Sequence, residues 1–131
     1  MGQRLASALP QHAWLAAERD REVIGWAATT PYLLVPEYAG IAEFSVYVSA
    51  RHRGSGAGRL LMTALMTGAS AAGVYKLTSR VFAGNLASRV MLTGVGFREV
   101  GTYIRHVRMN GEWRDVVIVE ALLGDARTQA P

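Results

Sequence analysis

Glycines and arginines are combined in one short segment at a spacing suited to binding a phosphate group. Gly54, Gly56 and Gly58 alternate with other residues between an apolar stretch and an amphipathic one. The first four N–H groups of a helix have no partner within it, and the helix dipole attracts anions to that end. Glycine lets the backbone approach a phosphate without an intervening Cβ. We therefore predict a pyrophosphate-binding turn, with positive charge supplied by Arg51, Arg53 and Arg59.

The spacing of the glycines separates this turn from two common phosphate-binding motifs. A P-loop requires a Gly-Lys pair followed by Ser or Thr, and the chain contains no Gly-Lys pair. The dinucleotide fingerprint places two residues between its second and third glycines, whereas these glycines are evenly spaced. The pattern that fits is Arg53-x-x-Gly56-x-Gly58 after a strand. The alternative is a glycine-rich connection with solvated arginines.

The sequence predicts an ordered series of strands and helices that positions the glycine turn. We expect a single domain over residues 1–123 and a flexible tail over 124–131. Period-2 and period-3.6 patterns and turn residues define the elements. Asn85 is a helix cap, and Asn110-Gly111 is a hairpin turn. The expected elements are the end of a helix at 5–9, strands at 13–17, 22–29 and 42–48, a helix at 57–72, a strand at 74–82, a short helix to Gly94, and strands at 97–107 and 113–123.

Composition narrows the class of protein. Half of the 131 residues are hydrophobic, no apolar run approaches the roughly 18 residues that cross a bilayer, and no apolar leader is present, so we expect a cytoplasmic protein without a membrane partner. The chain has no cysteine, and its three histidines lack metal-ligand spacing, so we expect no metal. The 14 basic and 10 acidic residues could indicate a nucleic-acid partner. A small polyanionic ligand explains the basic turn more economically, so we expect no nucleic-acid partner.

Several motifs in a fixed order resemble the GNAT N-acetyltransferases, and within them the phosphinothricin and methionine sulfoximine acetyltransferases. The motifs cover nearly the whole chain. They are Ala42-Glu43-x-Ser45-Val46-Tyr47-Val48-Ser49, the glycine turn, Asn85-x-x-Ser88, Gly96-Phe97, Gly101-Thr102-Tyr103 and Gly111-x-Trp113-x-Asp115-Val116. The resemblance implies an α/β fold with a mixed, mostly antiparallel sheet flanked by helices. Family members carry a longer N-terminal region, so we expect this chain to lack the usual first strand and helix.

The resemblance implies roles for particular residues. Glu43 matches the family's proposed catalytic base, although a surface-facing strand glutamate is the alternative. Acetyl-CoA is the implied cosubstrate, with its pantetheine arm paired to the strand like an added strand. The implied cofactor-binding residues are Val46, Tyr47, Val48, Arg53, Gly54, Ser55, Gly56, Ala57, Gly58, Asn85 and Ser88. An N-cap is the alternative role of Asn85, and the two roles are compatible.

Two departures from the family pattern affect the expected chemistry. Leu92 stands where the family has a Tyr or His facing the sulfur of coenzyme A, and Tyr103 or His106 is a possible substitute. The loop over residues 31–40 keeps Tyr32 and Tyr38, the predicted substrate-binding residues, but its usual basic positions hold Leu33, Val35 and Ala39. We therefore expect a preference for amines with a neutral or apolar tail, unless Arg105 or Arg108 compensates.

These observations favour an acetyl-CoA-dependent N-acetyltransferase acting on the primary amine of a small, amino-acid-like molecule. The alternative is a non-catalytic or partner-dependent protein that binds coenzyme A with an incomplete site. Because family members are commonly homodimers and the shortened N-terminus should leave apolar surface uncovered, we also expect a homodimer.

Overall fold

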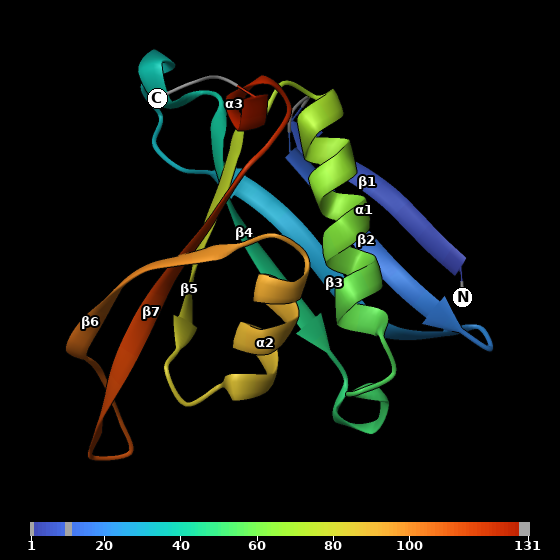
Figure 1. Ribbon diagram of the computed structural model, residues 1–131. Helices are drawn as coiled ribbons and strands as arrows, with labels where there is room; N and C mark the ends of the chain where they lie inside the picture. Colours follow the sequence, from blue (N-terminus) through green and yellow to red (C-terminus); the bar gives the residue numbers. More distant parts are fainter. Residues whose placement is uncertain (1, 10–11, 129–131) are drawn as a thin grey trace.

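The chain forms a twisted seven-stranded sheet with its two longer helices in front of it, as viewed in Figure 1. The computed structural model describes residues 2–9 and 12–128. The strands are β1 (Gly2–Leu9), β2 (His12–Arg19), β3 (Glu22–Pro31), β4 (Ile41–Val48), β5 (Lys76–Phe82), β6 (Arg98–Met109) and β7 (Glu112–Leu122). The helices are α1 (Ala57–Ala71), α2 (Leu86–Gly94) and α3 (Asp125–Thr128), with 3₁₀ turns at Pro36–Tyr38 and Ala50–His52. No helix in the described part of the chain is long and apolar enough to span a membrane.

The sheet has the order β1-β2-β3-β4-β5-β7-β6. Only the β4–β5 pair is parallel, and the other neighbouring strands pair antiparallel. The predicted fold class, a mixed and mostly antiparallel sheet flanked by helices, is confirmed. The single parallel pair lies in the middle of the sheet, and the candidate site is built around it.

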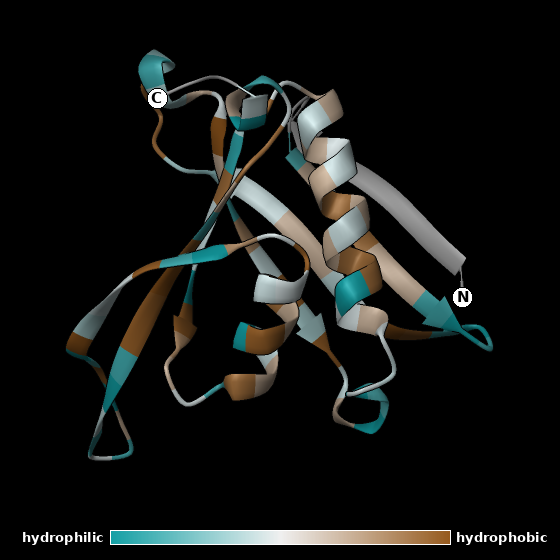
Figure 2. Ribbon diagram, viewed as in Figure 1, coloured by the Kyte–Doolittle hydropathy of each residue, from teal (hydrophilic) through white to brown (hydrophobic). Residues whose placement is uncertain are grey.

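The core lies between α1 and the sheet. Helix α1 packs against β2, β3 and β4, and Leu61, Met62 and Leu65 are fully buried on one side of it. This spacing gives a helix one apolar stripe, and each such side chain contributes about 1.5–3 kcal/mol of transfer free energy on burial. Figure 2 shows the hydrophobic positions on the helices and strands, whereas the turn joining β2 to β3 is hydrophilic. The glycine turn at the start of α1 is therefore held by a packed helix.

Two predictions at the ends of the chain need comment. Residues 5–9, predicted as the end of a helix, belong instead to β1, which pairs antiparallel with β2. Five residues are too few to sustain a helix on their own, whereas β2 offers a row of backbone groups that need partners. A strand thus precedes β2, although no helix precedes β2 among the described residues. In the predicted tail, Asp125–Thr128 form α3, while 129–131 lie outside the described residues, so the tail boundary stays a prediction.

Candidate active site

Strands β4 and β5 separate halfway along their length. Their parallel pairing covers Ile41–Glu43 and Lys76–Thr78. Immediately beyond it, the Ser79 hydroxyl donates a hydrogen bond of 2.8 Å to the carbonyl oxygen of Phe44. After that contact, no pairing between β4 and β5 is present, although every residue of both strands is described. The separation leaves one edge of the second half of β4 without a strand partner.

The backbone groups of Val46 and Val48 point toward this separation. Alternate residues of a strand direct their N–H and C=O groups to the same side, and the Phe44 carbonyl already faces β5. On the opposite side, the Ser49 N–H donates to Ile24 of β3 at 2.8 Å. The Val48 carbonyl accepts a hydrogen bond of 3.4 Å from Arg53 Nε. The backbone of Val46 is therefore placed to pair with an extended ligand, as an added strand would.

Tyr47 contributes differently from its two neighbours. By the same alternation its backbone faces β3, where it lies opposite Trp26. Its ring stacks on Trp26 with centroids 6.4 Å apart. Within the predicted set Val46, Tyr47 and Val48, the two valines thus present backbone groups to the separation, and Tyr47 presents a ring on the other face of the sheet.

The glycine turn before α1 contains two residues with a left-handed backbone conformation. Gly54 and Gly56 have φ values of 80° and 88°, a region in which only glycine is unstrained. A Cβ built at either position meets nothing within 4 Å, so the space beside both residues is open. Gly56 is the N-cap of α1 and supplies no side-chain cap to it. Open space beside Gly54 and Gly56 thus adjoins the start of α1, whose first N–H groups have no partner within the helix.

Other predicted members of the turn have structural roles. Gly58 lies inside α1, where an added Cβ would be 3.3 Å from Met91 and 3.6 Å from Val48. Ala57 is buried, so only its backbone can reach a ligand. The Ser55 hydroxyl donates to the carbonyl of His52. Arg59 donates to the Gly94 carbonyl at 3.4 Å and ties α1 to the end of α2.

Glu43 lies at the point where the two strands separate. Side chains alternate between the two faces of β4, so Phe44 is buried in the core while Glu43 lies on the other face. The carboxylate oxygens of Glu43 accept hydrogen bonds of 3.2 and 3.4 Å from Arg80 Nη2. The Glu43 and Arg80 side chains are 33% and 56% exposed, so both charged groups are accessible to a ligand.

Arg80 was not predicted from the sequence as a site residue. Its signal is the alternation along β5, where Lys76, Thr78 and Arg80 share one face. Thr78 lies opposite Glu43 in the parallel register. Arg80 is thus the next residue on that face of β5, and its long side chain reaches back to the carboxylate.

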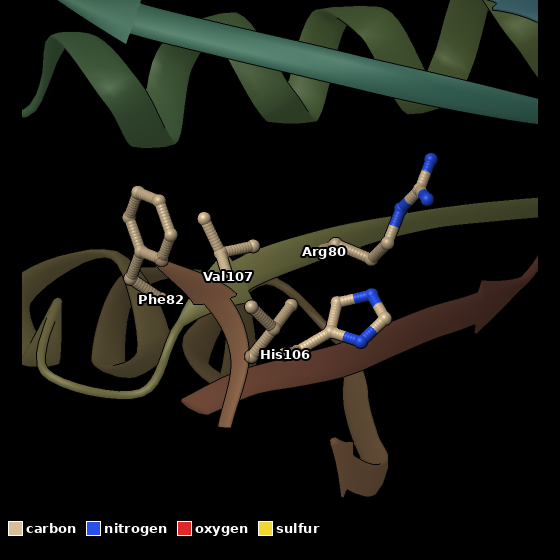
Figure 3. Close-up of a pocket in the computed structure, with 5 residues that line it drawn as sticks. Arg80, Phe82, His106 and Val107 are labelled. Carbon is tan, nitrogen blue, oxygen red and sulfur yellow. The ribbon is translucent and has the colours of Figure 1, made fainter. Parts of the chain in front are cut away.

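A cavity of about 280 Å³ opens beside Arg80. Figure 3 shows Phe82 at one end of it, and Arg80 and His106 at the other. Its walls are mainly apolar, since the lining residues are Arg80, Phe82, His106, Val107 and Val116. Arg80, the ion-pair partner of Glu43, thus links that carboxylate to the cavity, which suits a small molecule with an apolar portion.

A bulge in β6 brings His106 to this cavity. The β6–β7 register shifts between Tyr103 and Val107, and Arg105 within the bulge has a φ of 50°. The Arg105 N–H donates to Asp115 Oδ1 at 2.7 Å, which holds the bulge. The rings of His106 and Tyr103 stack with centroids 4.3 Å apart. Bulges of this kind redirect side chains next to functional sites.

The remaining predicted residues fall into two groups. Asn85 Oδ1 accepts a 3.2 Å hydrogen bond from the Ser88 N–H, which confirms Asn85 as the cap of α2 and leaves a contact with pantetheine a prediction. The rings of Tyr32 and Tyr38 lie together, with centroids 5.9 Å apart, and both are 40% exposed. Leu92 is 1% exposed in the core. No group of His, Asp or Glu able to hold a metal ion occurs among the described residues.

Comparison with known proteins agrees with this architecture. Residues 3–97 match the model of the Acetyltransferase (GNAT) family, so the chain belongs to that family. It is 34% identical over 101 residues to a phosphinothricin N-acetyltransferase of Streptomyces coelicolor, covering 77% of this chain and 59% of that protein. It is 29% identical over 114 residues to an L-methionine sulfoximine/L-methionine sulfone acetyltransferase of Pseudomonas paraeruginosa, covering 87% and 66% respectively. The predicted resemblance to these two groups is thus confirmed.

A solved structure shares the fold. The phosphinothricin acetyltransferase from Sinorhizobium meliloti, determined in complex with AcCoA, aligns with a TM-score of 0.85 and 24% identity. The alignment covers 93% of this chain and 66% of that one. The chain spans less than two thirds of the length of the curated relatives described above.

Proposed function

We propose that the protein transfers an acetyl group from acetyl-CoA to the primary amine of a small, amino-acid-like molecule. The observation that carries this proposal is the position of Glu43. This carboxylate lies at the separation of β4 and β5, and the same strand leads to the open glycine turn at the start of α1. Strand β4 thereby joins Glu43, the proposed general base, to the proposed phosphate-binding turn.

The proposed site divides the cosubstrate among three elements. The first N–H groups of α1, with Gly54 and Gly56, hold the pyrophosphate, and Arg53 adds charge beside Val48. The backbone of Val46 pairs with the pantetheine amides, and an N–H there polarises the thioester carbonyl. Asn85 and Ser88, at the start of α2, are the proposed contacts of the pantetheine arm. The structurally similar acetyltransferase from Sinorhizobium meliloti was determined in complex with AcCoA.

Glu43 has a defined task in this reaction. An alkyl ammonium has a pKa of about 10.4, so the nucleophilic form is scarce at neutral pH. Glu43 accepts the proton from the ammonium, directly or through water. The nitrogen lone pair then forms a bond to the acetyl carbon, and the bond from that carbon to sulfur breaks. The thiolate leaves with the bonding electron pair, and the acetylated amine loses its second proton to solvent.

Departure of the thiolate does not require the side chain at position 92. A thiol with a pKa of about 8.5 gains only about 2 kcal/mol from full protonation at pH 7. The lack of a side chain that donates this proton slows turnover by roughly tenfold to a hundredfold. Tyr103 and His106 stack on each other beside the cavity, and they are the side chains that can donate this proton instead.

The acceptor enters from the cavity beside Arg80. Its apolar walls favour a substrate with a neutral or apolar tail. The loop containing Tyr32 and Tyr38 provides the further contacts that we propose for the acceptor. No lysine or arginine occurs between residues 31 and 40, so this loop offers no cation to an anionic tail.

The test is acetylation of a panel of amino acids, followed by thiol release, with the wild type and Glu43→Gln. We expect Glu43→Gln to lower kcat/KM while acetyl-CoA affinity stays nearly unchanged. The deficit should shrink between about pH 7 and pH 9.5 as the amine loses its proton unaided. Glu112→Gln, a highly exposed glutamate at the β6–β7 hairpin, is the matched control. An activity ratio that does not change with pH would contradict Glu43 as the base.

A second candidate function has its own observation. Since the chain spans only 59% of the length of its Streptomyces coelicolor relative, a protein that binds coenzyme A without turnover is the alternative. Calorimetry that detects acetyl-CoA binding, together with no thiol release for any amine, would favour it.

We further propose a homodimer in the cytoplasm, where acetyl-CoA is available. Support for the dimer comes from apolar side chains left exposed on α2 and β6, among them Leu86, Val90 and Ile104, which are 64%, 73% and 59% exposed. A monomeric mass at micromolar concentration would contradict it.

A further inference from the structure

We propose that Arg80 anchors the carboxylate of the acceptor and that the acceptor inserts between Arg80 and Glu43. This inference rests on the proposed function and names the residue that selects the substrate. Arg80 lines the cavity and is bonded to Glu43 through Nη2. It was not among the residues that the sequence motifs identify.

The ion pair lies where β4 and β5 separate. Glu43 is the last residue of β4 paired with β5, and its partner there is Thr78. Arg80 lies two residues beyond Thr78 on β5. At the level of Arg80, β5 is still paired with β7 through Ile118 but no longer with β4. The two charges therefore face each other across the mouth of the strand separation.

The charge pattern that the Glu43–Arg80 pair presents matches that of a free α-amino acid. A free α-amino acid carries an ammonium and a carboxylate on one carbon. Its ammonium is attracted to Glu43, and its carboxylate to the guanidinium of Arg80, which presents several donors in a planar fork. Insertion replaces one ion pair by two, so neither charge loses its partner. A simple amine offers only one of the two charges, so Arg80 gains no new partner from it.

A carboxylate in this cavity has few cations to choose from. The loop at 31–40 contains no lysine or arginine. Among the residues that line the cavity, Arg80 is the only arginine or lysine, and Phe82, Val107 and Val116 are apolar. A carboxylate that enters this cavity therefore has one strong cationic partner, while an apolar side chain finds room against the walls.

The Glu43–Arg80 pair is weak enough to rearrange when a ligand binds. The Arg80 side chain is 56% exposed, and exposed ion pairs are individually weak. The guanidinium can therefore leave one Glu43 oxygen and turn to a ligand at little cost. In the unliganded protein Arg80 occupies the position that the substrate ammonium takes when bound.

The test compares three acceptors that differ at one carbon substituent. L-Methionine carries the carboxylate, L-methionine amide carries a neutral amide, and 3-(methylthio)propylamine carries neither. Their kcat/KM values are measured at saturating acetyl-CoA for the wild type, Arg80→Met and Arg80→Lys. Arg98→Met is the matched control, because Arg98 also forms an ion pair, with Glu120 at 2.6 Å on β6 and β7.

We expect the wild type to prefer L-methionine over the other two acceptors. Loss of a charge-assisted hydrogen bond lowers binding about tenfold to a hundredfold, so Arg80→Met should lose this preference by that factor. The values for the amide and the simple amine should hold or rise, since Arg80 no longer competes for Glu43. Arg80→Lys should recover part of the preference, and Arg98→Met should keep it. Equal losses for all three acceptors in Arg80→Met, or no wild-type preference, would overturn the proposal.

A binding measurement separates this proposal from the proposed function. The Nε–H signal of Arg80 is followed by NMR in the wild type with coenzyme A, while L-methionine or its amide is added. A shift with L-methionine and none with the amide supports the anchor, even if no acceptor is acetylated and the proposed function fails. Acetylation of L-methionine without any shift of the Arg80 signal would overturn the anchor and leave the acetyltransferase intact.

Discussion

The Ser79 hydroxyl and the Phe44 carbonyl form a hydrogen bond of 2.8 Å at the place where β4 and β5 cease to pair. A strand carbonyl next to such a separation would otherwise lack a partner from β5. Buried backbone acceptors are costly to leave unsatisfied. The serine thus ends the pairing without that cost and fixes Glu43, one residue earlier, relative to Arg80.

Ser79→Ala tests this role. Removing the hydroxyl should lower the free energy of unfolding by about 1 kcal/mol, because the carbonyl loses its donor. Urea unfolding measures the change, and Thr67→Ala is the control, since Thr67 donates to a carbonyl on the exposed side of α1. The kcat/KM of Ser79→Ala should fall more than that of Thr67→Ala. Equal effects of the two variants on activity would show that Glu43 does not depend on this bond.

Gly56→Ala should destabilise the protein and weaken acetyl-CoA binding together. Its φ of 88° costs a residue with a Cβ about 1–2 kcal/mol, and the methyl group enters the space proposed for the pyrophosphate. Gly73→Ala is matched to it, because Gly73 has a φ of 95° and equally open surroundings at the other end of α1. Calorimetry with acetyl-CoA should show a loss of affinity in Gly56→Ala alone.

Gly58→Ala completes this comparison. The added methyl group meets the flexible end of Met91 at 3.3 Å, and alanine is favoured over glycine within a helix by about 0.5–1 kcal/mol. We expect affinity for acetyl-CoA to be kept. Equal losses of affinity at all three glycines would mean that affinity follows the overall stability of the protein rather than contact between the turn and a bound phosphate.

Local periodicity was sufficient to predict most of the architecture. Asn85 was correctly identified as a cap, because N-capping depends only on neighbouring residues. The sequence also predicted a turn at Gly54 and Gly56, and glycine permits without strain the positive φ that both residues adopt. These signals are local, so they do not depend on the tertiary contacts of the rest of the chain.

Features that depend on distant partners were not predicted. Strand β1 exists through its register with β2, which no local pattern contains. The Glu43–Arg80 ion pair joins residues 37 apart and depends on which strand becomes the parallel neighbour of β4. The bulge that turns His106 toward the cavity depends on Asp115 of the next strand. Each of these features follows from tertiary pairing rather than from propensity.

The stability of the protein should depend on Glu120 at acidic pH. Burial raises the pKa of this carboxyl, but hydrogen bonds from Arg98 and Lys76 outweigh burial and hold it below its usual value. A carboxyl with a lowered pKa stabilises the folded state above about pH 4.5, and this contribution is lost as the pH falls below that value. The Tm difference between the wild type and Glu120→Gln should therefore be largest near neutral pH and shrink below about pH 4. Thermal unfolding across this range measures it, and Glu112→Gln should show no such trend.

Leu92→Tyr places the family's usual aromatic residue at a position that this chain has buried. Leu92 is 1% exposed within the core, so the larger ring must displace its neighbours, at a cost of about 1–3 kcal/mol. Its hydroxyl group would also enter an apolar environment, which adds a penalty unless it finds a partner. We expect a lower free energy of unfolding in urea and no rise in kcat. Thr93→Tyr, on an exposed part of the same helix, should leave stability nearly unchanged. A kcat above that of the wild type with undiminished stability would show instead that position 92 faces the thioester and that the leucine alone limits turnover.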